Sequence, residues 1–127
     1  MKLPDFFGFL AGLAYLAGSV VCHQLPERSF FTAGMQWPVC ARCAGIYLGV
    51  AVGFAAWWML RRWISPRPGG RAWLTMLAVV ATPTAASWVG GVLGFWDGTN
   101  GIRFALAAPL GLTVGVIAAA VTAKDLR

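Results

Sequence analysis

The sequence predicts an all-α integral membrane protein, a polytopic four-helix bundle formed by a single domain over residues 1–127. Hydrophobic residues make up 59% of the chain and charged residues only 11%, which is more apolar surface than a soluble domain of this length can bury. Four apolar stretches, at about 5–22, 44–61, 72–94 and 102–122, approach the roughly 20 residues that a helix needs to cross a bilayer. The seven tryptophans fit the same class, because several lie near the ends of these stretches, where aromatic belts form.

The first stretch, 5–22, has one competing interpretation, a cleaved signal peptide with Ala17-Gly18-Ser19 as the small-residue cleavage site. The basic region of such a signal is weak here, because Asp5 offsets Lys2. A lipoprotein signal is also disfavoured, since the bulky Val21 precedes the cysteine where a small residue is needed. We therefore expect this stretch to be retained as the first membrane helix.

Glycines at four-residue spacing recur in the apolar stretches and predict where helices pack. They are Gly8 and Gly12, then Gly45, Gly49 and Gly53, then Gly90 and Gly94, then Gly111 and Gly115. Small residues at this spacing let two helix backbones approach closely, and we expect packing within the chain rather than between copies. In the third stretch, Pro83 predicts a kink.

The basic residues predict the orientation in the membrane. Four crossings place both termini and the second connection on one side, and seven of the ten Lys and Arg residues belong to it: Lys2, Arg61, Arg62, Arg67, Arg71, Lys124 and Arg127. Because short loops rich in Lys and Arg stay in the cytoplasm, both termini should be cytoplasmic and the loop at 24–39 extracytoplasmic. The net charge of +6 forms no basic stripe with interleaved aromatics, so we expect membrane lipids and no nucleic acid as partners.

All three cysteines and the only histidine lie in two short stretches, Cys22-His23 and Cys40-x-x-Cys43. The Cys-x-x-Cys spacing lets two thiolates reach one tetrahedral ion from a tight turn, and three cysteines with one histidine are one of the structural zinc sets. The adjacency of Cys22 and His23 leaves two arrangements open, because neighbouring side chains diverge unless the backbone bends there. If only one of them binds, three protein ligands and an open position remain, as in catalytic zinc sites.

Zinc is the predicted ion, and Cu(I) also suits thiolates with an imidazole. An alternative is a redox dithiol, in which Cys40 and Cys43 exchange disulfides, Cys22 resolves and a quinone accepts electrons between the helices. A further alternative is non-catalytic, a metal-cross-linked scaffold or a subunit of a membrane complex. As protein partners, further copies of the chain or a membrane complex are both open. Three cysteines cannot all pair within one chain, so the remaining thiol needs a metal, burial or a catalytic role.

The same side of the membrane gathers further polar residues. Glu27 and Asp97 are predicted acid–base groups, with salt bridging as their alternative role. Arg28, Arg42 and Arg103 are predicted to hold an anionic group. With an open metal position, these residues would make a metal-dependent enzyme acting on a lipid or another amphiphile from the outer leaflet.

Around these residues the chain resembles a bacterial and archaeal family of small multi-spanning membrane proteins classed as a domain of unknown function. The resemblance rests on Cys22-His23-Gln24, Pro26-Glu27-Arg28-Ser29-Phe30, Gly34, Pro38-Val39-Cys40-Ala41-Arg42-Cys43, Gly45-Ile46-Tyr47 and Gly49, and more weakly on Pro83, Thr99-Asn100 and Arg103. It implies a shared site in the cytoplasmic membrane of a bacterium or archaeon, without an assigned activity. The family often carries an acidic residue near the position of Ser87, so this chain departs from the pattern there.

A looser similarity, in topology and in Cys40 and Cys43 alone, is to the four-helix quinone-linked thiol oxidoreductases.

Overall fold

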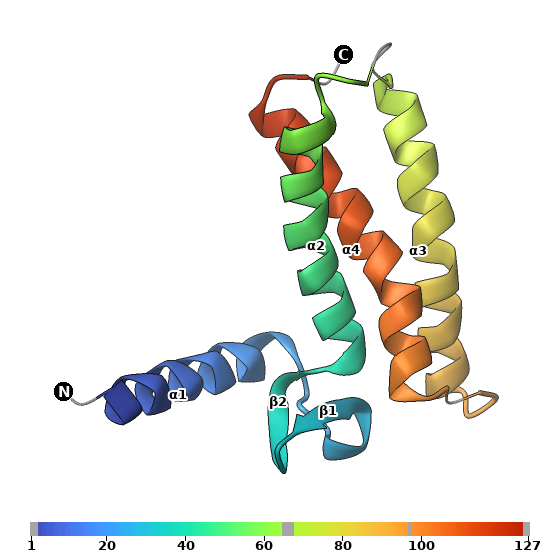
Figure 1. Ribbon diagram of the computed structural model, residues 1–127. Helices are drawn as coiled ribbons and strands as arrows, with labels where there is room; N and C mark the ends of the chain where they lie inside the picture. The colour runs from blue at the N-terminus through green and yellow to red at the C-terminus, as the bar shows by residue number, and fades with distance from the viewer. Residues whose placement is uncertain (1–2, 65–67, 97, 126–127) are drawn as a thin grey trace.

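The computed structural model describes residues 3–64, 68–96 and 98–125 (Figure 1). The elements in chain order are α1 (Leu3–Val21), the 3-10 turn η1 (Pro26–Arg28), β1 (Ser29–Thr32), β2 (Met35–Cys40), α2 (Ala41–Leu60), α3 (Gly70–Val92) and α4 (Asn100–Thr122). All four α-helices are long and apolar enough to cross a membrane, which confirms the predicted all-α membrane class. The helices begin and end within three residues of the limits expected from the apolar stretches.

Helices α2 and α4 pack backbone to backbone, because glycines face the contact from both sides. A methyl group added at Gly111 would lie 2.1 Å from the carbonyl oxygen of Ile46, and one at Gly49 would lie 2.5 Å from that of Ala108. Both distances are far below a normal contact, so only glycine fits. The prediction that these stripes pack within the chain is therefore confirmed for α2 and α4. Helix α3 packs against α4, where the Thr84 hydroxyl donates to the Leu106 carbonyl at 2.7 Å.

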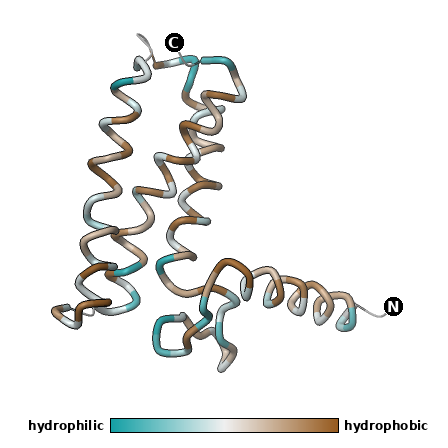
Figure 2. The backbone as a smooth tube through the Cα atoms, turned by 180° about the vertical axis from the view of Figure 1, so that it is seen from behind, coloured by the Kyte–Doolittle hydropathy of each residue, from teal (hydrophilic) through white to brown (hydrophobic). Residues whose placement is uncertain are grey.

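Helix α1 stands apart from the other three helices and runs across their common direction (Figures 1 and 2). Its main packing partner is β2 rather than a helix, and the Tyr15 hydroxyl donates to the carbonyl of Gln36 on that strand. Methyl groups added at Gly8 or Gly12 would meet nothing within 4 Å. The tight bundle therefore consists of three helices, and the expectation that the stripe of Gly8 and Gly12 packs within the chain is wrong. Near the end of α1, Gly18 does pack within the chain, against the Pro38 carbonyl of β2.

A β-hairpin joins α1 to α2, in the segment 24–39 where the sequence predicts a loop. Strands β1 and β2 pair antiparallel, with Phe31 opposite Gln36 and Thr32 opposite Met35. Ala33 and Gly34 form the turn with φ values of 52° and 78°, the two left-handed residues of a type I′ connection. The hairpin is held against the bundle by Asn100, which begins α4 and donates its side-chain amide to the Ser29 carbonyl at 3.1 Å.

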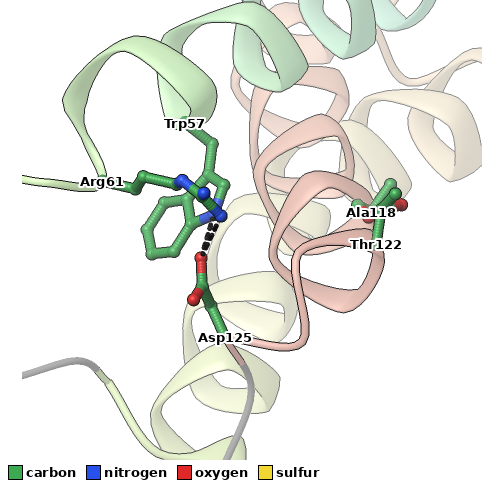
Figure 3. Close-up of polar contacts among 5 residues, drawn as sticks. All are labelled: Trp57, Arg61, Ala118, Thr122 and Asp125. Atoms are coloured by element: carbon green, nitrogen blue, oxygen red, sulfur yellow. Dashed lines mark hydrogen bonds and ion pairs between the residues drawn. The ribbon is translucent and has the colours of Figure 1, made fainter.

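The opposite end of the bundle is closed by a buried carboxylate. Asp125 follows α4, is only 7% exposed, and accepts hydrogen bonds at 3.2 Å from the Trp57 indole and from the Arg61 guanidinium (Figure 3). The left-handed Lys124 turns the chain back, and the Asp125 amide donates to the Ala120 carbonyl at 2.8 Å. These contacts tie the end of α2 to the end of α4, far along α2 from the cysteines.

Candidate metal centre

Three thiols from three different parts of the chain converge at the base of the bundle. Cys22 follows α1, Cys40 ends β2 and Cys43 lies in the first turn of α2. Their sulfur atoms all lie within 4.8 Å of one another, and none is in a disulfide. In a tetrahedral zinc site, Zn–S bonds of about 2.3 Å place the sulfurs roughly 3.8 Å apart. The three thiols are therefore positioned to hold a metal ion with only small adjustments.

Backbone amides are directed at two of the sulfurs. The Cys22 sulfur accepts from the Cys40 amide at 3.2 Å and from the Gln24 amide at 3.5 Å. Cys40 is the N-cap of α2, and its sulfur accepts from the Cys43 amide at 3.5 Å. These bonds hold the sulfurs of Cys22 and Cys40 beside the start of α2.

The surroundings of Cys40 lower the pKa of its thiol. The thiol of Cys43 donates to the Cys40 sulfur, and this bond, with the amides of Cys43 and Arg42, lowers the pKa of Cys40 to about 5 against the opposing effect of burial. A thiol in such a site is ionised at neutral pH. The surroundings of Cys40 therefore favour its thiolate form, which is the form that binds metals.

Gln24 organises the ends of the elements that carry the cysteines. It adopts a left-handed conformation with φ of 50°, which bends the backbone directly after the Cys22-His23 pair. Its side-chain amide donates to the carbonyls of Tyr15, at 2.9 Å, and of Pro38, at 2.6 Å. In turn, the Gln36 amide donates to the Gln24 carbonyl at 2.7 Å. Gln24 therefore links α1 to β2 beside the sulfurs, a role that sequence reasoning missed.

His23 does not join the three sulfurs. It is exposed, and its ring nitrogens are not among the ligand atoms that lie within 4.8 Å of one another. It does line the same cavity as the cysteines, so a role as fourth ligand stays a prediction. Of the two arrangements left open by the sequence, the geometry favours three thiolates with an open position.

A cavity of ≈ 190 Å³ adjoins the sulfurs, and its walls include two of the predicted anion-binding residues. Arg28 comes from η1 and Arg42 from the first turn of α2, and the Nε atom of each is buried without a hydrogen-bond partner. Arg42 also donates to the hydroxyl of Ser87 at 3.1 Å. Ser87 on α3 does not line the cavity itself, but it contacts the cavity wall through Arg42.

Two of the remaining predicted residues, Glu27 and Arg103, do not line the cavity. Glu27 is exposed on η1 and does not line it. Arg103 is buried in α4, where its guanidinium donates to the side-chain oxygen of Asn100 at 2.9 Å. Asp97 lies outside the described residues. The acid–base roles of Glu27 and Asp97 and the anion-binding role of Arg103 stay predictions.

The region that matches a known family contains this site. The family described as "Predicted membrane protein (DUF2085)" matches residues 22–117, a region that begins at Cys22 and contains all three cysteines. An uncharacterized protein of Methanocaldococcus jannaschii is 33% identical over 113 residues, which are 89% of this chain and 70% of the relative. An uncharacterized protein of Methanothermobacter thermautotrophicus is 31% identical over 97 residues, which are 76% and 83% of the two chains. No solved structure matches the chain.

Proposed function

This chain belongs to the DUF2085 family of predicted membrane proteins, and within that family we propose that it carries a zinc centre held by Cys22, Cys40 and Cys43. The observation that carries the proposal is the meeting of three free sulfurs, from the end of α1, from β2 and from α2, within 4.8 Å. Residues 18 and 21 positions apart along the chain come together here, and amide donors face two of the sulfurs. We therefore interpret the three sulfurs as the ligands of one ion rather than as three unrelated thiols.

Zinc fits the donor set, because thiolates are soft ligands and zinc accepts three of them together with a fourth ligand of another kind. Cu(I) shares the preference for thiolates and is the second choice of ion. A metal of this kind would also cross-link the ends of α1 and β2 to the start of α2, which would stabilise the hairpin segment between the two helices.

The open position supports a more specific proposal, a metal-dependent enzyme that acts on a lipid or other amphiphilic substrate. The cavity beside the sulfurs would admit the polar part of the substrate, and the charge bias of the loops favours a position of this end of the bundle outside the cytoplasm. Zinc with an open position supplies Lewis-acid chemistry or an activated water. Arg28 and Arg42 would orient an anionic group of the substrate.

Elemental analysis paired with thiol counting tests the metal centre. We expect the purified protein to carry stoichiometric zinc, and its three thiols to resist alkylation until a chelator removes the ion. Replacing Cys22, Cys40 or Cys43 by serine should remove stoichiometric zinc. Met35→Ala is the matched control, because Met35 is exposed on the same hairpin. A protein without any metal in which all three thiols react freely would refute the proposal.

The substitution His23→Ala separates a closed site from an open one. If zinc is held only by the three cysteines and a non-protein ligand, the substitution should leave the zinc content at the wild-type value. Loss of zinc in this variant would make His23 the fourth ligand and would remove the basis for an open catalytic position.

One observation favours a second function, thiol–disulfide exchange. Cys40 caps the N-terminus of α2, and the sulfur of Cys43 lies within 4.8 Å of its sulfur, as in a redox dithiol. Oxidation would form the Cys40–Cys43 bond and release two electrons and two protons, which a membrane quinone would accept to become a quinol. Oxidation of the reduced, metal-free Cys40–Cys43 dithiol to a disulfide by added quinone, with formation of quinol, would support this function over the zinc centre.

A further inference from the structure

The cavity beside the cysteines holds two guanidinium groups with unmet donors. The Nε atoms of Arg28 and Arg42 are each buried without a hydrogen-bond partner. A buried donor of a charged group that lacks an acceptor is costly, so an acceptor from outside the protein is expected there. Arg42 is held in place by its bond to the buried Ser87 hydroxyl, which leaves its planar fork at a defined position.

The charge of the cavity points to an anion. No aspartate or glutamate is among the described residues that line it. Three thiolates with a divalent ion carry one negative charge, which is less than the two positive charges of Arg28 and Arg42. The net charge at the cavity is therefore positive even when the metal is bound. A ligand with at least one negative charge would balance it.

The size and the walls of the cavity restrict the class of ligand that it can hold. Its volume of ≈ 190 Å³ lies below the roughly 300–1,000 Å³ of sites that enclose drug-sized ligands, so it suits a headgroup and not a whole lipid. The other walls include Val21, Leu25 and Trp88, which are 57%, 40% and 56% exposed. These apolar groups lie at the end of the bundle where a membrane surface would be, and they offer contact to an acyl chain.

We propose that this cavity binds a phosphate group, presented by the headgroup of an anionic lipid, through Arg28 and Arg42. Guanidinium forks pair with phosphate oxygens in a bidentate manner, and phosphate carries the charge that the cavity lacks. The inference deepens the proposed function by naming the class of substrate at that site, and it rests on the proposed function for the metal beside the phosphate. The binding of phosphate by the arginines depends on this chain's residues alone.

Calorimetric titration of the purified protein in a zwitterionic detergent tests the proposal. The probes are dioctanoyl phosphatidate, dioctanoylglycerol with the same tails and no phosphate, and inorganic phosphate. We expect phosphatidate to bind and dioctanoylglycerol not to bind. Arg28→Gln and Arg42→Gln should each weaken the binding of phosphatidate by about tenfold or more, since each removes a charge-assisted contact. Arg62→Gln is the control, because Arg62 is exposed at the other end of α2.

Two further readouts keep a folding defect apart from a binding defect. Zinc content should stay at the wild-type value in the glutamine variants, and Arg42→Lys should recover part of the affinity because it restores the charge without the fork. Tight binding of phosphatidate alone would identify the lipid headgroup as the source. Equal binding of inorganic phosphate that depends on the arginines would identify free phosphate and would still support the arginine site.

The proposal is overturned if dioctanoylglycerol binds as well as phosphatidate, or if neither glutamine variant weakens phosphatidate binding. Its failure is distinct from that of the metal centre. Zinc-loaded protein without phosphate binding would refute the phosphate site alone, and metal-free protein with arginine-dependent binding would refute the metal centre alone.

Discussion

Replacing Gln24 with alanine should weaken zinc binding although Gln24 is not a ligand. Its side-chain amide donates to the carbonyls of Tyr15 and Pro38 at 2.9 and 2.6 Å, and so ties the helix before Cys22 to the strand that ends at Cys40. Without these bonds the two sulfurs would no longer be held at one place before the ion binds. Part of the binding free energy would then be spent on ordering the hairpin.

The magnitude follows from the two lost bonds. Each contributes about 1 kcal/mol net, so their removal costs about 2 kcal/mol, which is roughly a thirtyfold weaker zinc affinity. The substitution adds no backbone strain of its own, because alanine and glutamine both carry a Cβ and meet the same penalty at the left-handed φ of 50°. Gln24→Glu keeps the size of the side chain but removes both donors, so it should weaken zinc at least as much.

Competition with a chromophoric zinc chelator measures the affinity of each variant in detergent. Ser19→Ala is the control, because the Ser19 hydroxyl is exposed and bonds the Leu16 carbonyl of its own helix, at 2.7 Å. We expect its zinc affinity to match the wild type. A zinc affinity of Gln24→Ala within twofold of the wild type would refute the reasoning that the glutamine network preorganises the sulfurs.

Three other predictions concern the bundle and its orientation. Gly111→Ala should destabilise the protein by about 1–3 kcal/mol, because its methyl group would lie 2.1 Å from a carbonyl oxygen of α2. Gly12→Ala should leave the stability unchanged or raise it, because the added methyl group meets nothing within 4 Å. Chemical unfolding in detergent compares the two variants, and an equal loss of stability in both would contradict the packing argument. Asp125→Ala should lower the free energy of unfolding by about 1–2 kcal/mol, because it leaves the buried Trp57 indole without its acceptor. The control Thr122→Ala loses only an exposed bond within α4 and should change this free energy by less than about 0.5 kcal/mol. Thermal unfolding followed by tryptophan fluorescence measures both. The Lys and Arg bias predicts a cytoplasmic C-terminus. A fluorescent protein fused there should therefore fluoresce, and a phosphatase fused there should be inactive. An inactive fluorescent protein with an active phosphatase would show that the terminus is not cytoplasmic.

The helices were predictable because the membrane acts on each of them locally. An apolar run of the right length must satisfy its own backbone hydrogen bonds in the bilayer, so length and hydropathy suffice to locate it. The hairpin was not predictable in the same way. Its turn is Ala33-Gly34 rather than the asparagine–glycine pair that signals such turns, and Pro38 within β2 argues against a strand.

The glycine stripes show both outcomes. In α2 and α4 the four-residue spacing correctly predicted close packing, because two such stripes meet each other in the fold. In α1 the same spacing at Gly8 and Gly12 has no neighbour among the described residues of the chain. A glycine stripe allows another element to pack closely against a helix. The arrangement of the helices determines whether an element lies there.

The sequence by itself determined the membrane class, the helices and the pair of stretches that hold every cysteine, because composition and local hydrogen bonding decide these properties. It also predicted that Cys22 and His23 would diverge unless the backbone bent. The tertiary structure decided the rest. The left-handed Gln24 and the hairpin register bring the sulfur of Cys22 to those of Cys40 and Cys43 while His23 stays exposed, and they place Arg28 and Arg42 at the cavity but not Glu27. The direction of a side chain depends on backbone angles set by contacts with distant residues, such as those of Gln24 with Tyr15 and Pro38, and no local pattern encodes those contacts.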